Sequence, residues 1–149
     1  MKIECRLAGA NNIPTLLPMM ADFNAIDGYH FDERITRHNL RTFIANERMG
    51  RLWMIISDEN IIGYIALTYG FSFEFKGLTA FIDELFLLEP FRGKGIGGQV
   101  IDHIDQQAQQ LGIKALHLEV ERHNEKGKRL YVKKGFKEHE RALMTKRFT

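Results

Sequence analysis

The sequence predicts a single α/β (α+β) domain in which helices pack on the faces of a mixed β-sheet. The 149 residues match the usual size of one compact domain and leave no room for two independent cores. Segments with alternating apolar residues, as in strands, are interleaved with segments whose apolar residues recur every three to four positions, as in helices. No repeat, low-complexity tract or linker interrupts residues 1–149, so we expect one continuous domain.

Composition indicates a globular protein in the cytoplasm. Hydrophobic residues make up 44% of the chain and charged residues 27%, the ordinary balance of soluble domains. No apolar run approaches the roughly 20 residues that span a bilayer, and the N-terminal segment alternates like a strand, unlike a signal peptide. The single cysteine, Cys5, cannot form an internal disulfide, and we interpret it as a structural thiol.

Caps and periodicity predict the elements of the N-terminal half. Strands are expected at residues 1–7, 51–57 and 61–69, and helices at residues 11–23 and 32–47. Asn11 or Asn12 can cap the first helix, which has Pro14 in its tolerated first turn. Asp32 can cap the second helix. The short turn between the second and third strands predicts that they form a hairpin.

The C-terminal half continues the alternation of strands and helices. Strands are expected at residues 78–88, 115–120 and 136–148, and helices at residues 95–111 and 124–134. The segment 78–88 is the most apolar strand, so we expect it at the centre of the sheet. Ile96, Val100 and Ile104 lie on one stripe of the third helix, and Gly135 ends the fourth. The predicted order is β-α-α-β-β-β-α-β-α-β.

The turn between residues 88 and 98 carries the clearest functional signal. A buried strand is followed by a short turn and by glycines that open a helix. The first N–H groups of a helix lack internal partners and carry partial positive charge, so they suit an anion. Arg92 and Lys94 add full charges that suit a pyrophosphate. Glycines that would let a phosphate approach the backbone are Gly93, Gly95, Gly97 and Gly98. The alternative is a tight turn that only permits close helix packing.

Two common phosphate motifs do not fit this turn. A P-loop requires Ser or Thr after its Gly-Lys pair, and a dinucleotide-binding fingerprint requires a βαβ unit with an acidic residue about 20 positions further on. The turn instead resembles the coenzyme-A motif of the GNAT acetyltransferases, Arg or Gln-x-x-Gly-x-Gly or Ala. The matching residues are Arg92-Gly93-Lys94-Gly95-Ile96-Gly97.

Flanking segments extend the resemblance. Upstream, Leu85-Phe86-Leu87 corresponds to the strand triplet of the family. Downstream, the family pattern Asn-x-x-Ala-x-x-Leu-Tyr-x-x-x-Gly-Phe is matched by Asn124, Leu130, Tyr131, Gly135 and Phe136, with Gly127 where alanine is usual. The resemblance implies a GNAT-like mixed, mostly antiparallel central sheet flanked by helices.

The resemblance also implies an N-acetyltransferase with acetyl-CoA as its cosubstrate. A primary amine would attack the thioester directly, and a backbone N–H near Leu87 would polarise the carbonyl where the strand splays at a bulge. Pantetheine would pair with the open strand edge near Leu87 and Glu89. The implied cofactor-binding residues are Leu87, Glu89, Arg92, Gly93, Lys94, Gly95, Ile96, Gly97, Gly98 and Asn124.

Three residues are candidates for proton transfer. Tyr131 matches the family tyrosine that donates a proton to the leaving thiolate, although it could be a core tyrosine. Asp83 and Glu84 are the candidate bases. Because successive strand residues face opposite sides, we expect only one of them to point at the substrate cleft. Relatives that act on diamines carry an acid at the position of Asp83. The alternative is that either carboxylate pairs with a basic neighbour.

Two aromatic and acidic loops are expected to select the acceptor. Such loops suit a small cationic amine through cation–π contacts and ion pairing, or they could roof the core or form a dimer contact. The predicted substrate-binding residues are Tyr29, His30, Phe31, Phe71, Phe73 and Glu74. The histidines show no metal-ligand spacing, so we expect no metal.

The acceptor and partners stay open at the level of sequence. A small cationic amine or amino-acid-like acceptor is expected, with protein N-termini, lysine side chains or a non-catalytic CoA-binding module as alternatives. The net charge is +2, and its basic residues crowd near the C-terminus. We expect neither nucleic-acid nor membrane partners, since a solvated helix face explains that charge equally well. A homodimer is left open.

Overall fold

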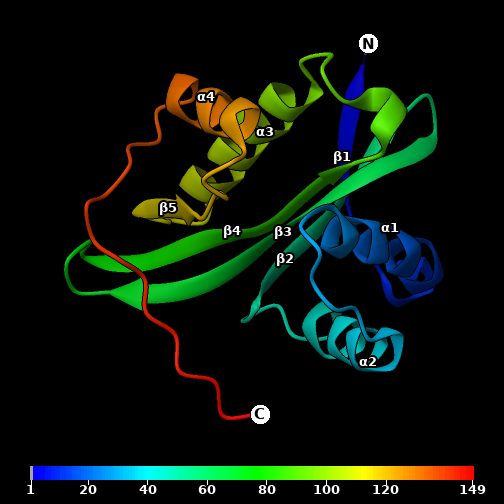
Figure 1. Cartoon of the computed structure of the whole chain (residues 1–149), viewed down its shortest axis with the longest axis horizontal. Coiled ribbons are helices and arrows are strands. Elements are labelled where there is room, and N and C mark those ends of the chain that lie inside the picture. The colour runs from blue at the N-terminus through cyan, green and yellow to red at the C-terminus, as the bar shows by residue number, and fades with distance from the viewer. Residues whose placement is uncertain (1) are drawn as a thin grey trace. The chain divides into compact units, whose positions relative to one another are not determined.

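The chain folds around a five-stranded sheet with the strand order β1-β2-β3-β4-β5 (Figure 1). The computed structural model describes residues 2–149, which form two units, one ending at Glu119 and the other comprising Val120–Thr149. The strands are β1 (Ile3–Leu7), β2 (Gly50–Ser57), β3 (Asn60–Ser72), β4 (Gly77–Leu87) and β5 (Ala115–Leu118). The helices are α1 (Ile13–Ile26), α2 (Glu33–Ile44), α3 (Ile96–Gln110) and α4 (Glu125–Lys133), with short 3-10 helices η1 (Ala10–Asn12) and η2 (Glu89–Phe91).

Strands β1 to β4 pair antiparallel, and β5 pairs parallel to β4. This confirms the mixed, mostly antiparallel sheet. The middle strand is β3, so the prediction that residues 78–88 form the centre is wrong. β4 is nevertheless strongly apolar, because it has a neighbour on each side and helices over both faces.

The helices of the first unit lie on both sides of the sheet, with α1 and α2 on one face and α3 on the other (Figure 1). Leu52 and Met54 of β2 belong to the buried cluster that includes α1 and α2. Between them, Trp53 points to the opposite face, where its ring meets His103 of α3 at 6.0 Å. Alternation along β2 therefore fills two apolar layers.

Local signals in the sequence account for several element ends. Asp32 caps α2, since its carboxylate accepts a hydrogen bond from the Ile35 N–H at 3.0 Å. Asn12 precedes α1 but makes no side-chain capping bond to that helix. Its side-chain oxygen instead accepts a hydrogen bond from the Gly9 N–H at 2.8 Å, across η1. Burial, together with the nearby Glu4, raises the pKa of the half-buried Cys5 to about 11. That thiol is therefore protonated at neutral pH, as expected of a structural cysteine.

The second unit is built on α4. Asn124 caps this helix by accepting a hydrogen bond from the Gly127 N–H at 3.0 Å, and Gly135 follows it with φ +98°. Within the described residues, no strand forms between 136 and 149, so the predicted last strand is wrong. Residues 137–141 are charged or histidine without apolar alternation, and Leu143 and Phe148 remain 70% and 87% exposed. In residues 2–149, no helix combines the length and apolarity needed to cross a membrane.

Candidate active site

A register shift in β4 organises the site. Ala66 of β3 pairs with Glu84, whereas the next residue, Leu67, pairs with Ile82. Asp83 is therefore an extra residue in β4, and such a bulge re-aims the side chains beside it. As a consequence, Asp83 and Glu84 both line one cavity. The expectation that only one of these successive carboxylates could face a cleft assumed an unbroken strand, and that assumption is wrong.

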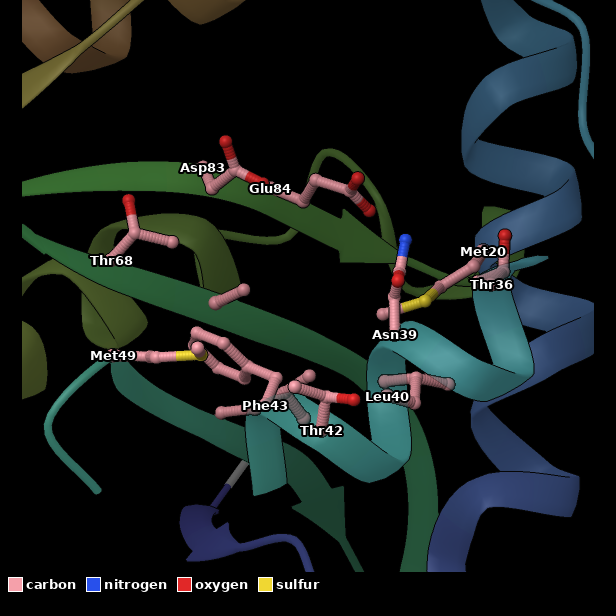
Figure 2. Close-up of a pocket in the computed structure, with 12 residues that line it drawn as sticks. Met20, Thr36, Asn39, Leu40, Thr42, Phe43, Met49, Thr68, Asp83 and Glu84 are labelled. Carbon is pink, nitrogen blue, oxygen red and sulfur yellow. The ribbon is translucent and has the colours of Figure 1, made fainter. Parts of the chain in front are cut away.

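The cavity lies between α2 and the strands β3 and β4, and has a volume of about 460 Å³ (Figure 2). Figure 2 shows Glu84 extending from β4 toward Asn39 of α2, with Asp83 and Thr68 further along the strands. Its uncharged polar lining is Thr36, Asn39, Thr42 and Thr68. Its apolar lining is Met20, Leu40, Phe43, Met49, Leu52 and Ala66. The cavity therefore combines an apolar wall with two acids and several neutral hydrogen-bonding groups.

The two carboxylates have different surroundings. The fully buried Tyr64 donates a hydrogen bond from its hydroxyl to Glu84 Oε1 at 2.6 Å. Burial raises the pKa of Glu84, the Tyr64 hydrogen bond opposes that rise, and the Asp83 charge adds to it. Burial alone raises the pKa of Asp83. A carboxylate with a raised pKa accepts a proton more readily, which suits both acids to work on a protonated amine.

One edge of β4 loses its partner at the bulge. β5 pairs with β4 only from Thr79 to Ile82. Among residues 2–149, the following stretch of β4, residues 83–87, has no strand partner on that edge. Unpaired strand edges present N–H and C=O groups to which an extended molecule can add as a further strand.

The glycine turn follows this open edge. Gly93 and Gly95 have φ values of +74° and +80°, and a Cβ at either position would meet no atom within 4 Å. Backbone conformation, not crowding, therefore requires glycine there. Gly95 is the N-cap of α3 and provides no side chain to the first N–H groups of that helix. A tight turn and an anion site both fit this geometry, and the cofactor-binding role of the glycines stays a prediction.

Arg92 lies at the junction of the open edge and the glycine turn. Its guanidinium lies 5.3 Å from the centre of the Phe86 ring, and its Nε donates a hydrogen bond to the Leu87 carbonyl at 2.8 Å. Phe86 in turn stacks on Tyr64, with ring centres 5.8 Å apart. Lys94 is exposed beside the turn. The Arg92 guanidinium is thus directed back toward the end of β4, and its predicted role at the start of α3 stays a prediction.

The six residues predicted to bind the acceptor do not line this cavity within the described chain. Tyr29 and Phe73 are 59% and 91% exposed, His30 and Glu74 are also exposed, and Phe31 packs against the core. The rings of Phe71 and Phe73 contact each other at 5.6 Å. A role for any of them in acceptor binding stays a prediction.

Sequence reasoning missed the contribution of α2. Thr36, Asn39 and Phe43 recur at spacings of three and four and so share one helix face, together with the buried Leu40. Polar residues mixed into an otherwise core-facing stripe are the signal that could have indicated a cavity.

Tyr131 lies in α4 of the second unit, and Asn124 is the N-cap of that helix. The Tyr131 ring meets Phe136 edge-on at 5.9 Å, and burial raises the pKa of its phenol. Asn124 caps the helix, and a Cβ at Gly127 would come within 2.5 Å of the Asn124 amide. Glycine in place of the usual alanine therefore leaves room for this cap. The catalytic role of Tyr131 and the cofactor role of Asn124 stay predictions.

The profile of the GNAT acetyltransferase family matches residues 17–136. The chain belongs to this family. It is 35% identical over 88 residues to the uncharacterized N-acetyltransferase YycN of Bacillus subtilis (strain 168), an alignment covering 58% of this chain and 55% of that protein. The match thus spans little more than half the length of that relative.

Solved structures share the GNAT fold of this chain. The integron cassette protein HFX_CASS3, from the mobile metagenome of Cole Harbour Salt Marsh, has a TM-score of 0.87 and 29% identity, covering 97% of this chain and 90% of that chain. A predicted acetyltransferase from Clostridium acetobutylicum, solved with acetyl-CoA, has a TM-score of 0.81 and 18% identity, covering 97% and 96%. The predicted fold class and family are confirmed.

Proposed function

We propose that this GNAT protein transfers the acetyl group of acetyl-CoA to the primary amine of a small molecule bound in the cavity between α2 and β4. The observation that carries this proposal is the bulge at Asp83, where two successive acidic residues line one cavity beside an unpaired strand edge. The Clostridium acetobutylicum relative contains acetyl-CoA, which supports the same cosubstrate here.

The cosubstrate would extend from the open edge of β4 to the start of α3. Pantetheine would pair with the strand end at Leu87 and continue past Glu89. The pyrophosphate would accept hydrogen bonds from the backbone of the glycine turn at the N-terminus of α3. Arg92 and Lys94 would neutralise its charge. For Arg92 this requires its guanidinium to move from the Leu87 carbonyl toward the phosphates.

The cavity carboxylates would attract the protonated amine and accept its proton. An alkyl amine arrives largely protonated at neutral pH, and the ammonium would be attracted to Asp83 and Glu84. One carboxylate accepts a proton, directly or through water, and the neutral amine then attacks the thioester carbon. A backbone N–H near Leu87 would stabilise the oxyanion. The C–S bond breaks as the amide forms, and the nitrogen releases its second proton to water. Tyr131 would protonate the departing thiolate and regain a proton from water.

Thiol release from acetyl-CoA in the presence of a library of primary amines tests this function. We expect release that depends on both acetyl-CoA and the amine, with a mass increase of the amine by one acetyl group. Glu84→Gln should reduce the rate, whereas Glu33→Gln on the exposed start of α2 should not. Binding of CoA without turnover on any amine would instead indicate a non-catalytic CoA-binding module.

The cytoplasmic location and the absence of nucleic-acid and membrane partners stay predictions from the sequence.

A further inference from the structure

The charge of the cavity restricts which amines it can hold. We propose that the acceptor is an alkyl or aralkyl amine without a carboxylate, and that the cavity rejects the corresponding α-amino acid. This inference rests on the proposed function, because it concerns the acceptor bound in the same cavity.

The charged groups in the lining of the cavity are acids. Among the described residues that line it, Asp83 and Glu84 are the charged groups, and none is Lys, Arg or His. α2 does carry cations, but they lie outside the lining. Arg37, for example, pairs with Glu33 at 3.1 Å. A carboxylate on the acceptor would therefore enter a partly buried site without the cation that a desolvated carboxylate requires.

Repulsion from the cavity acids adds to this cost. In an α-amino acid the carboxylate is only two bonds from the amine nitrogen, so an amine held at Glu84 brings its own carboxylate close to two anions. Coulomb repulsion between unit charges about 6 Å apart near a protein surface corresponds to on the order of 10²-fold in affinity. Burial raises the pKa of both acids and no cation contributes to either shift, which agrees with an uncompensated negative site.

The volume and the uncharged lining residues indicate what kind of acceptor the cavity can hold. A volume of about 460 Å³ falls within the range of small-molecule sites. Met20, Phe43 and Met49 offer adaptable apolar contacts for an alkyl or aromatic group. Thr42 and Thr68 can bond a hydroxyl or amide. The cavity therefore favours an apolar amine with at most neutral polar substituents.

A three-member acceptor series separates charge from size. It consists of an amine, the amide of the matching amino acid and the amino acid itself, such as tyramine, tyrosinamide and tyrosine. The body is chosen to match the best amine of the library. With the full chain and acetyl-CoA, we expect kcat/KM for the amine to exceed that for the amino acid by at least about 50-fold, and the neutral amide to resemble the amine. Deprotonation alone would favour the amino acid over the amine, because an α-amino group loses its proton at lower pH than an alkyl ammonium. The expected order is the opposite one.

A charge added to the cavity provides the reciprocal test. Thr42→Lys introduces a cation at a lining position of α2, and His38→Lys makes a matched change on the same helix outside the lining. We expect Thr42→Lys to narrow the preference for amine over amino acid by about tenfold, and His38→Lys to leave it unchanged. Circular dichroism of both variants would verify that the fold is retained.

The outcomes distinguish this inference from the proposed function. Equal use of amine and amino acid, or rejection of the neutral amide along with the amino acid, would overturn the charge argument while leaving an acetyltransferase. An unchanged preference in Thr42→Lys would also contradict it. If no amine of any kind supports thiol release, the proposed function itself is wrong.

Discussion

Tyr64→Phe removes the hydroxyl that donates to Glu84 Oε1 at 2.6 Å and leaves the aromatic ring in place. The ring should still stack on Phe86, 5.8 Å away, so the change is confined to one hydrogen bond. A hydrogen bond to a charged group contributes about 1.5–3 kcal/mol, and one pH unit corresponds to about 1.4 kcal/mol. Tyr64 can also bond the protonated acid, so only the difference between the two bonds appears in the pKa, an effect of about one unit.

The direction of the change in the Glu84 pKa depends on which form of Glu84 the Tyr64 hydroxyl stabilises. Tyr64 bonds the ionised carboxylate and opposes the pKa rise caused by burial. Without it the pKa of Glu84 rises further, and a larger fraction of Glu84 is protonated at a given pH. If ionised Glu84 binds or deprotonates the amine, the acid limb of kcat/KM should move to higher pH by about one unit.

The assay is kcat/KM against pH, from about pH 5 to pH 9, with acetyl-CoA saturating and the amine fixed. Tyr69→Phe is the matched control, because it deletes the same hydroxyl from the same strand, and Tyr69 does not line the cavity. Wild-type and Tyr69→Phe profiles should coincide. A Tyr64→Phe profile that also coincides with them would show that the Tyr64–Glu84 bond has no part in acceptor chemistry.

The other predictions concern the cosubstrate site, the proton donor and the cost of the cavity acids. Arg92→Ala should weaken acetyl-CoA binding by about 1.5–3 kcal/mol in calorimetry, and unchanged affinity would remove the pyrophosphate role. Gly97→Val should abolish CoA binding while circular dichroism stays native-like, since a branched side chain blocks approach to the backbone; retained binding would mean that the turn is only structural. Tyr131→Phe should lower turnover by about 10²-fold with little change in acetyl-CoA affinity, and wild-type turnover would exclude the phenol as proton donor. Burial raises the pKa of Asp83, so its ionised form destabilises the fold above that pKa and the cost vanishes as pH falls. Asp83→Asn should therefore raise Tm at about pH 8 but not at about pH 3, and an equal shift at both would point to a different cause.

Local chemistry explains which parts of this fold could be predicted from the sequence. The Asp32 cap and the glycines before α3 are determined by short-range backbone geometry, so their neighbours in the sequence suffice to predict them. The place of β4 in the sheet depends on which strands lie beside it, and apolar content alone cannot distinguish the middle strand from the fourth. The missing strand after Gly135 shows the same limit, since an extended, charged segment needs a partner strand to become part of a sheet.

The residue types of the candidate site could be predicted from the sequence, but their arrangement in space could not. Asp83 and Glu84 were predicted as candidate bases, but their joint place in one cavity depends on a register shift against Ala66 and Leu67, which only the pairing of two distant segments reveals. The contribution of α2 was missed because Thr36 and Asn39 read as ordinary surface residues until the cavity beneath them is known.

The bulge links the two halves of the proposed reaction. β5 leaves β4 after Ile82, and Asp83 is the next residue. A bulge adds twist to its strand, and a strand that twists more sharply at Asp83 diverges from a parallel neighbour paired only up to Ile82. The extra residue therefore lies where the edge on which pantetheine would pair begins, and where two acids line the proposed acceptor cavity. An amine held by those acids and a thioester held along residues 83–87 would then approach each other across one short segment of backbone, which is the positioning that direct acetyl transfer requires.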